Sequence, residues 1–167
     1  MAIETITKTG VLIIDPQPNM AALIATMARS IGRRDIREAY DANQALVELR
    51  RRIFDVVILD DALNGADAVD FVRRLRTTRD CQNRLTPIVM MAASPDAVRI
   101  AAARDAGINE FLRKPFAATH LKARLDAIAG QPRAFIEAEA YTGPDRRRRT
   151  REIGRERRHA DPSPDRP

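Results

Sequence analysis

Short apolar runs alternate with longer amphipathic stretches from Val11 to Gly130, and this alternation limits the possible folds more than any other feature of the sequence. Runs of about four apolar residues suit strands that are buried on both faces of a parallel sheet. Parallel strands need crossover connections, and the amphipathic stretches suit crossover helices. The sequence therefore predicts an α/β fold with a five-stranded, doubly wound parallel sheet. The expected strands are Val11–Ile14, Ile36–Ala39, Val56–Leu59, Ile88–Met91 and Glu110–Leu112.

Capping and breaking residues indicate where the helices lie. Ser94 followed by Pro95 predicts an N-cap with proline at the first helical position. A last helix is expected from about Ala117 to Ala129, because Gly130 and Pro132 follow it.

The composition changes after this last helix, so the chain divides into an α/β domain, residues 9–130, and a tail, residues 131–167. The segment Ala134–Tyr141 is interpreted as a short helical extension. From Arg146 onward the tail contains one large aliphatic residue, Ile153, which buries too little apolar surface to offset chain entropy. We therefore expect this arginine-rich tail to be disordered in the absence of a ligand.

Positive charge is concentrated in the tail. From Ala140 to the end the chain has nine arginines and five acidic residues, whereas the first 139 residues have 20 basic and 18 acidic side chains. Such asymmetry is typical of a segment that binds anions.

Other features exclude several classes of protein. One cysteine and two histidines leave no internal disulfide and no cysteine-based metal site. No apolar run approaches the ~18 residues of a membrane span, and the first residues lack the pattern of a signal peptide. The sequence therefore favours a cytoplasmic protein without membrane insertion.

Three polar residues follow strands of the predicted sheet. Asp15 follows the first strand, Asp60 the third and Lys114 the fifth. In a doubly wound sheet, ligands bind at the carboxyl ends of the strands, where the strand order reverses. We therefore expect these three side chains to converge on one site.

At these residues the chain resembles the CheY-like response-regulator receiver family, whose fold is flavodoxin-like. The resemblance covers Val11 to about Ala129 and rests on VLIID, DVVILDDALNGAD, TPIVMMAAS and FLRKPF, with a cis bond expected before Pro115. It implies that Asp60 is the phosphoacceptor, that Asp15 and Asp60 can bind Mg²⁺, and that Lys114 contacts the phosphoryl group. Hard cations need carboxylate oxygens, and a transferred phosphoryl group needs cationic neighbours.

Two positions depart from that family's pattern. Pro16 replaces the second acid of the pair after the first strand, and Ala92 replaces the Ser or Thr that ends the fourth. Two hypotheses remain: the three residues form a salt-linked cluster without turnover, or Asp60 is still phosphorylated. We do not expect an enzyme, because the sequence offers no nucleophile–base pair beyond this degraded site.

The tail contains a duplicated motif. Gly143-Pro144-Asp145-Arg146-Arg147 recurs eleven residues later as Gly154-Arg155-Glu156-Arg157-Arg158. Each copy reads Gly, any residue, acid, Arg, Arg. The N7/O6 edge of guanine presents two acceptors to a planar guanidinium, and its other edge presents N–H donors to a carboxylate.

Two copies indicate a short ligand with repeated guanines, such as a cyclic guanine dinucleotide. Tyr141 is interpreted either as stacking on an outer guanine or as packing on the last helix. The predicted cyclic di-GMP-binding residues are Tyr141, Gly143, Pro144, Asp145, Arg146, Arg147, Arg148, Arg149, Gly154, Arg155, Glu156, Arg157, Arg158 and Asp161.

A receiver domain followed by YTGPDRRRR resembles the Cle group of CheY-like cyclic di-GMP effectors. This resemblance implies that the tail binds cyclic di-GMP. Two ligand molecules are expected per chain, because two motif copies can contact four guanines. The resemblance also implies recruitment from the cytoplasm to the flagellar motor switch protein and an effect on motility and surface attachment. Two alternatives remain: a response regulator driven by phosphorylation of Asp60, and nonspecific nucleic-acid binding, which the five acids of the tail disfavour.

Overall fold

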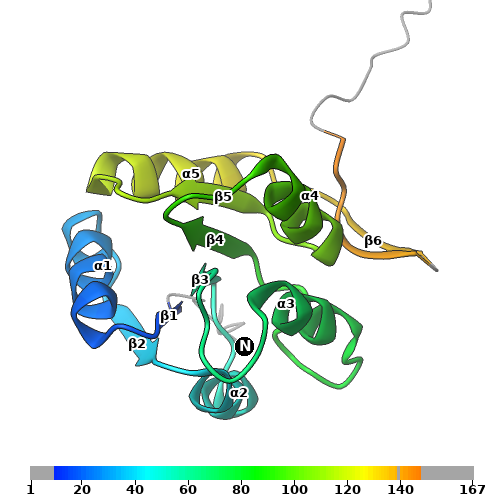
Figure 1. Cartoon of the computed structure of the whole chain (residues 1–167), viewed down its shortest axis with the longest axis horizontal. Coiled ribbons are helices and arrows are strands. Elements are labelled where there is room, and N and C mark those ends of the chain that lie inside the picture. Colours follow the sequence, from blue (N-terminus) through cyan, green and yellow to red (C-terminus); the bar gives the residue numbers. More distant parts are fainter. Residues whose placement is uncertain (1–9, 139, 148–167) are drawn as a thin grey trace, which may run out of the picture.

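The computed structural model describes residues 10–138 and 140–147 of the 167-residue chain (Figure 1). The strands of its main sheet are β1 (Gly10–Ile14), β2 (Asp35–Ala39), β3 (Val56–Asp60), β4 (Ile88–Ala92) and β5 (Glu110–Arg113). The helices are α1 (Pro18–Ser30), α2 (Ala42–Arg51), α3 (Ala68–Thr77), α4 (Ala97–Ala106) and α5 (Ala118–Gly130). A hairpin follows, made of β6 (Phe135–Ala138) and β7 (Tyr141–Pro144).

The main sheet has the strand order β2-β1-β3-β4-β5, which confirms the predicted doubly wound fold. All neighbouring strands pair in parallel. Each strand matches its predicted range to within one residue at either end. The carboxyl ends of β1, β3 and β5 therefore lie at one edge of the sheet. The peptide bond between Lys114 and Pro115 is cis, as predicted.

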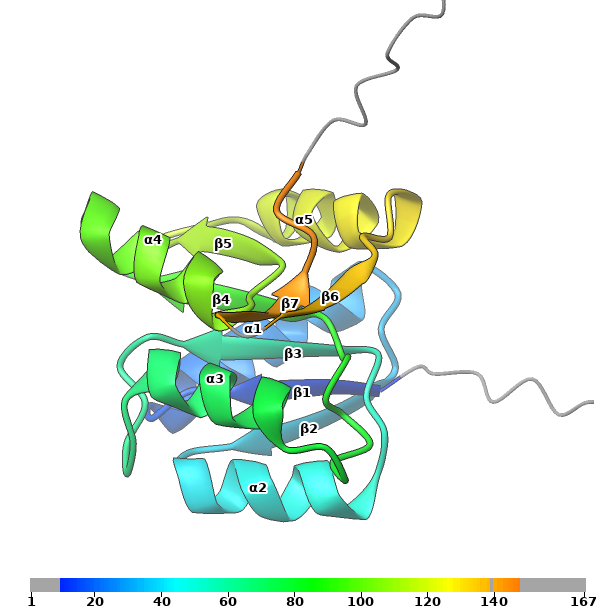
Figure 2. The ribbon, with the colours of Figure 1, turned by 90° about the vertical axis from the view of Figure 1, so that its right-hand side faces the viewer.

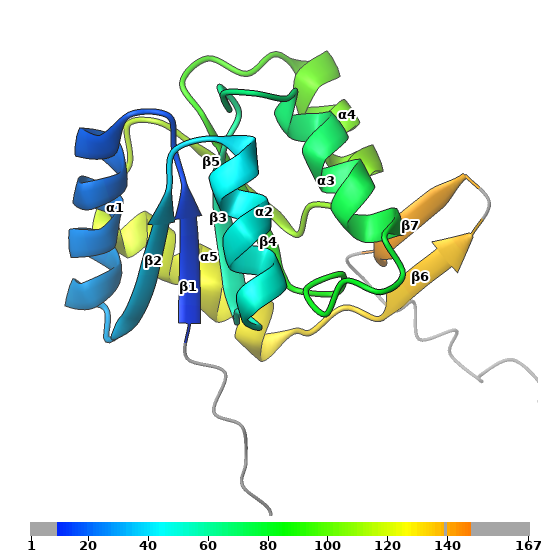
Figure 3. The ribbon, with the colours of Figure 1, turned by 90° about the horizontal axis from the view of Figure 1, so that it is seen from below.

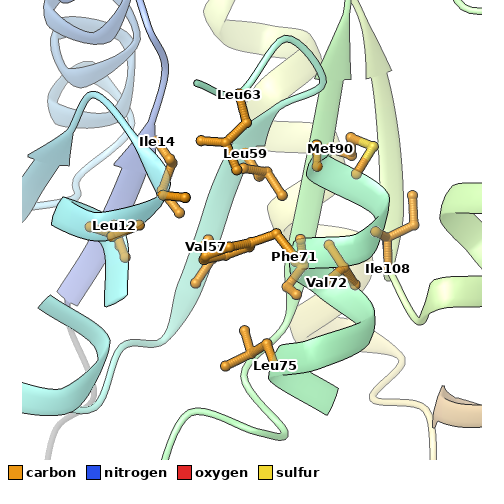
Figure 4. Packing of buried hydrophobic residues seen from close by; sticks show 14 of the residues in the cluster. Leu12, Ile14, Val57, Leu59, Leu63, Phe71, Val72, Leu75, Met90 and Ile108 are labelled. Carbon is orange, nitrogen blue, oxygen red and sulfur yellow. The ribbon is translucent and has the colours of Figure 1, made fainter. Parts of the chain in front are cut away.

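Two apolar cores lie on the two faces of this sheet. Leu12 and Ile14 belong to the core under α2, α3 and α4, where Phe71 of α3 also packs (Figure 4). Val11 and Ile13 belong to the opposite core, under α1 and α5. Figure 1 shows these two helices on one side of the sheet and the other three on the opposite side. Burial on both faces explains why the strands are continuous apolar runs in the sequence.

The helical extension predicted over Ala134–Tyr141 is wrong, because this segment belongs to an antiparallel hairpin. Phe135 lies opposite Pro144, and the N–H of Asp145 donates to the carbonyl of Ala134 at 2.7 Å. The aromatic and β-branched residues of the segment favour a strand over a helix. The hairpin lies beside α3 and α4 (Figures 2 and 3), so this part of the predicted tail packs on the α/β domain.

A buried arginine on α3 lies beneath the hairpin. The side chain of Arg76 donates to the carbonyl oxygens of Gly107 at 3.0 Å, Arg84 at 2.6 Å and Thr86 at 2.8 Å. It also donates to Oδ1 of Asn109 at 3.1 Å. Burial lowers the pKa of the Arg76 guanidinium to about 10, so this group is still charged at neutral pH. A charge this deeply buried is held by hydrogen bonds to four uncharged oxygens.

The first residue of the hairpin packs on this arginine. The guanidinium carbon of Arg76 and that of Arg84 each lie 5.7 Å from the centroid of the Phe135 ring. Arg84 also forms an ion pair with Glu137 at 2.7 Å. Cation–π contacts and an ion pair therefore fix β6 on the surface formed by α3 and the loop after it.

Helix α4 begins two residues later than predicted, so the expected N-cap at Ser94 is wrong. The N-cap is Asp96, whose carboxylate accepts a hydrogen bond from the backbone N–H of Arg99 at 2.7 Å. Both serine and aspartate are good N-cap residues, and the sequence offered both within three positions. The hydrogen bond shows that aspartate caps the helix.

Replacing the true cap should destabilise the domain, and replacing the predicted cap should not. We expect Asp96→Ala to lower the free energy of unfolding by about 1 kcal/mol, because a backbone N–H at the start of α4 loses its acceptor. The exposed Ser94 forms no cap, so Ser94→Ala should leave the free energy of unfolding unchanged. Urea unfolding of both variants measures the difference; equal values for the two would contradict the assignment of the cap.

Among residues 10–138 and 140–147, every helix is too short or too polar to cross a membrane.

Candidate functional site

Asp15, Asp60 and Lys114 form one cluster at the carboxyl ends of the strands. Asp15 directly follows β1, Asp60 ends β3 and Lys114 directly follows β5. The ammonium group of Lys114 donates to Oδ2 of Asp15 at 3.0 Å and also to Oδ2 of Asp60. Both aspartates are buried, with 1% and 5% of their surface exposed. The structure thus brings together the three residues that the sequence places at this edge.

Backbone N–H groups hold the other two carboxylate oxygens of the cluster. The N–H of Gln17 donates to Oδ1 of Asp15 at 2.9 Å, and the N–H of Ala62 donates to Oδ1 of Asp60 at 2.7 Å. Every carboxylate oxygen of the two aspartates therefore has a protein donor. This arrangement gives every polar atom of the two buried side chains a hydrogen-bond partner, as a salt-linked cluster requires.

The lysine of the cluster is strongly held in its charged form. Burial by itself disfavours the ammonium, but the hydrogen bonds and charges of Asp60 and Asp15 outweigh burial and raise the pKa of Lys114 above its ordinary value of 10.5. Lys114 is therefore a cation at neutral pH. One cation beside two carboxylates leaves the cluster with a net negative charge.

A cavity of about 460 Å³ opens beside the cluster, and Pro16 and Ala92 form part of its wall. Mg²⁺ is usually bound by one or two carboxylates together with water, so Asp15 and Asp60 are the residues that would hold it here. Within the described residues, no group of three or more His, Cys, Asp or Glu side chains is arranged to hold a metal ion. The fit to Mg²⁺ is therefore limited to these two carboxylates, both already bound by Lys114.

A salt bridge that sequence reasoning missed connects α4 with the loop after β3. The guanidinium of Arg99 binds Asp61 at 2.6 Å and Asp67 at 3.1 Å. Asp61 directly follows Asp60, so the first turn of α4 is fixed to the residue beside the predicted phosphoacceptor. No local motif signals a contact between residues so far apart in the sequence.

The other predicted site is separate from this cluster and lies near the opposite end of α4. Of its residues, the structure describes Tyr141, Gly143, Pro144, Asp145, Arg146 and Arg147, which are in β7 or directly after it. Arg148, Arg149, Gly154, Arg155, Glu156, Arg157, Arg158 and Asp161 lie outside the described residues. The first copy of the duplicated motif can therefore be placed, and the second cannot.

The first copy of the motif contacts the C-terminal end of α4. Arg146 forms an ion pair with Asp105 at 2.8 Å, and its guanidinium carbon lies 3.9 Å from the centroid of the Tyr141 ring. The hydroxyl of Tyr141 donates to the carbonyl of Pro144 at 2.6 Å, which fixes the orientation of the ring. The ring of Tyr141 therefore lies under Arg146, beside the end of α4.

Two glycines meet where the hairpin touches α4. Gly107 ends α4 with a φ of +112°, a conformation that favours glycine. A Cβ atom on Gly143 would lie only 2.7 Å from the Cα atom of Gly107. The glycine of the first motif copy is thus required for the close approach of the hairpin backbone to the end of α4.

Comparisons with known proteins agree with this geometry. The family model described as Response regulator receiver domain matches residues 11–126. Chemotaxis protein CheY-3 of Vibrio cholerae is 30% identical over 118 residues, 71% of this chain and 89% of that protein. Chemotaxis protein CheY of Pseudomonas aeruginosa is also 30% identical over 118 residues, 71% of this chain and 94% of that protein. A solved structure also matches, that of the receiver domain of the Pseudomonas aeruginosa sensor histidine kinase PA1611, with a TM-score of 0.65 and 26% sequence identity. The match covers 73% of this chain and 98% of that one. That structure has a magnesium ion in its active-site cleft.

Proposed function

The chain belongs to the response regulator receiver domain family, and from this premise we propose that it is a non-enzymatic effector that binds cyclic di-GMP through its arginine-rich tail. Ligand binding would direct the receiver domain to the flagellar motor switch protein and so adjust motility and surface attachment. The resemblance of the tail to the Cle group, and most of all to its member CleD, supports this role. The relatives named as chemotaxis proteins are consistent with a partner in the flagellar motor.

The observation that carries the proposal is the duplicated motif. A run of arginines would bind anions without an acid at the same position in both copies, as Asp145 and Glu156 are. An acid followed by two arginines offers both a carboxylate for the N1–H and N2–H edge of guanine and a guanidinium for the N7/O6 edge. The duplication therefore favours a guanine ligand over nucleic acid in general.

The energies of such contacts decide whether a tail of this length can bind. A bidentate contact between arginine and guanine contributes about 1–3 kcal/mol, whereas ordering a tail costs about 2–5 kcal/mol. One guanine gives almost no net affinity. Four guanines, supplied by two intercalated cyclic di-GMP molecules, give about 4–12 kcal/mol before phosphate contacts are added. Binding at micromolar concentration therefore requires more than one ligand per chain.

Calorimetric titration of cyclic di-GMP into the full chain tests the proposal. We expect micromolar or tighter binding with a stoichiometry above one ligand per chain, and no comparable heat from GMP, which lacks the second guanine. A one-to-one curve would contradict the duplicated site. No heat with either nucleotide would overturn the proposed function.

The alternative function is that of a response regulator driven by phosphorylation. The observation in its favour is the assembled cluster, in which Lys114 lies beside the carboxylate of Asp60. Pro16 and Ala92, in the wall of the same cavity, speak against it, because neither supplies a carboxylate or a hydroxyl. Intact-mass measurement after incubation with acetyl phosphate and Mg²⁺ distinguishes the two. A phosphoryl adduct that is lost in Asp60→Asn would favour this alternative.

A further inference from the structure

The hairpin places the first acid-Arg-Arg copy directly on the α/β domain. Arg146 binds Asp105, and Gly143 touches Gly107, the residue that ends α4. A ligand that contacts the start of the arginine run would therefore lie against α4. The side chains around this point decide whether the domain also takes part in binding.

A cavity of about 540 Å³ lies between the hairpin, α4, β5 and α5. Clefts of about 300–1,000 Å³ are typical of small-molecule sites. Its wall includes Arg104 of α4, Arg124 of α5, Arg133 of the segment before the hairpin, and Arg146. Three of these four arginines belong to parts of the chain outside the duplicated motif.

The balance of charge in this cavity favours an anion. Four guanidinium groups face two carboxylates, those of Asp105 and Glu110. Arg124 and Arg133 bind Glu110 at 3.5 Å and 3.4 Å, longer than the 2.8 Å between Arg146 and Asp105. A guanidinium has five N–H donors, so each of these arginines can keep its contact with Glu110 and donate to a phosphate as well.

Aromatic rings supply the second feature that a nucleotide needs. Tyr141 and Phe111 both line the cavity. The ring of Tyr141 is held in place by its hydroxyl hydrogen bond to Pro144, and Arg146 lies over it at 3.9 Å. Bases stack on such rings and on guanidinium planes. The cavity thus combines fixed cations for phosphates with flat surfaces for a base.

We propose that the cyclic di-GMP site is composite, and that Arg104 and Arg124 of the domain, together with Arg133 just before the hairpin, bind the phosphates of a ligand held between the hairpin and α4. This inference rests on the proposed function, because the ligand is the one assigned to the tail. It differs from that function in making the domain part of the site. A tail that binds alone would not need Arg104 and Arg124, which belong to α4 and α5.

Calorimetry on a full-length double variant tests the composite site. Arg104→Glu combined with Arg133→Gln changes the charge of the cavity and leaves Arg124 to bind Glu110. Each lost hydrogen bond to a charged group weakens binding about tenfold, so we expect the dissociation constant for cyclic di-GMP to rise by about tenfold or more. The matched control is Arg34→Glu combined with Arg79→Gln, which makes the same change in charge at two exposed residues that do not line the cavity. This control should bind like the wild type.

The outcomes separate this inference from the function on which it rests. If the wild-type chain binds cyclic di-GMP and the cavity variant binds it with the same affinity, the composite site is overturned and the tail is the whole site. Equal weakening in both double variants would assign the effect to long-range charge and also overturn the composite site. No binding by the wild-type chain would overturn both proposals.

A second measurement does not depend on affinity. In an amide ¹H–¹⁵N spectrum of the full chain, saturation with cyclic di-GMP should shift the signals of Asn109, Glu110 and Phe111, which line the cavity. The signals of α2, which does not line the cavity, should stay in place. Unchanged signals for the three cavity residues would place the ligand on the tail alone.

Discussion

Replacing Arg147 and Arg158 together with alanine should abolish cyclic di-GMP binding and leave the receiver domain folded. These two arginines occupy the last position of the two motif copies. The loss of two bidentate guanine contacts removes about 2–6 kcal/mol, which corresponds to a dissociation constant weaker by about 30-fold or more. The rest of the binding energy only just exceeds the cost of ordering the tail, so calorimetry should show no measurable binding.

The fold of this variant should be unaffected, because Arg147 is exposed and its backbone N–H, not its side chain, donates to Asp145 at 2.9 Å. A double replacement of Arg34 and Arg79 by alanine removes the same charge from two other exposed positions and should keep full affinity. Retained binding in the Arg147 and Arg158 variant would show that the duplicated motif is not the site. Circular dichroism of both variants should match the wild type.

The variant Arg76→Met should lower the free energy of unfolding by about 2–4 kcal/mol. Methionine keeps most of the side-chain volume but removes all four hydrogen bonds of the guanidinium. Each buried carbonyl that loses its donor lowers the free energy of unfolding by about 1–3 kcal/mol. The variant no longer has to bury a charge, and this gain offsets part of the loss. Urea unfolding measures the change.

A control on the same helix separates the buried contacts from the general effect of losing an arginine. Arg73 is exposed and pairs with Asp70 one turn away on α3. Such pairs are worth about 0.2–0.5 kcal/mol, so Arg73→Met should cost no more than that. A similar cost for the two variants would mean that the hydrogen bonds of Arg76 contribute little to stability. Loss of the Arg76 guanidinium should also detach the hairpin from α3. Altered amide NMR signals of Phe135 and Gly143 would show this.

Most of the α/β domain could be predicted from the sequence because the signals are local. Strands buried on both faces need continuous apolar runs, and such runs end within one residue of the observed strands. The convergence of Asp15, Asp60 and Lys114 follows from topology alone, since parallel strands place their carboxyl ends at one edge. Neither conclusion requires knowledge of a specific contact between side chains.

The hairpin could not be predicted, because the contacts that fix it come from residues distant in the sequence. In the sequence, Arg76 is one of several basic residues on an amphipathic stretch, and nothing local marks it as buried. Its position becomes clear only when Gly107, Arg84 and Thr86 present their carbonyls to it. The ring of Phe135 in the hairpin then packs against the guanidinium of Arg76. The salt bridge of Arg99 escaped prediction for the same reason.

Helix α4 connects the aspartate cluster with the first copy of the motif. Arg99 in its first turn is bound to Asp61, beside the aspartate cluster, and Asp105 in its last turn is bound to Arg146 of the motif. Ten helical residues span only about 15 Å. If a ligand bound at one end changes the affinity for a ligand at the other end, thermodynamic linkage requires the same factor in both directions. Arg99 and Asp105 therefore give the aspartate cluster and the motif a direct connection through one short helix.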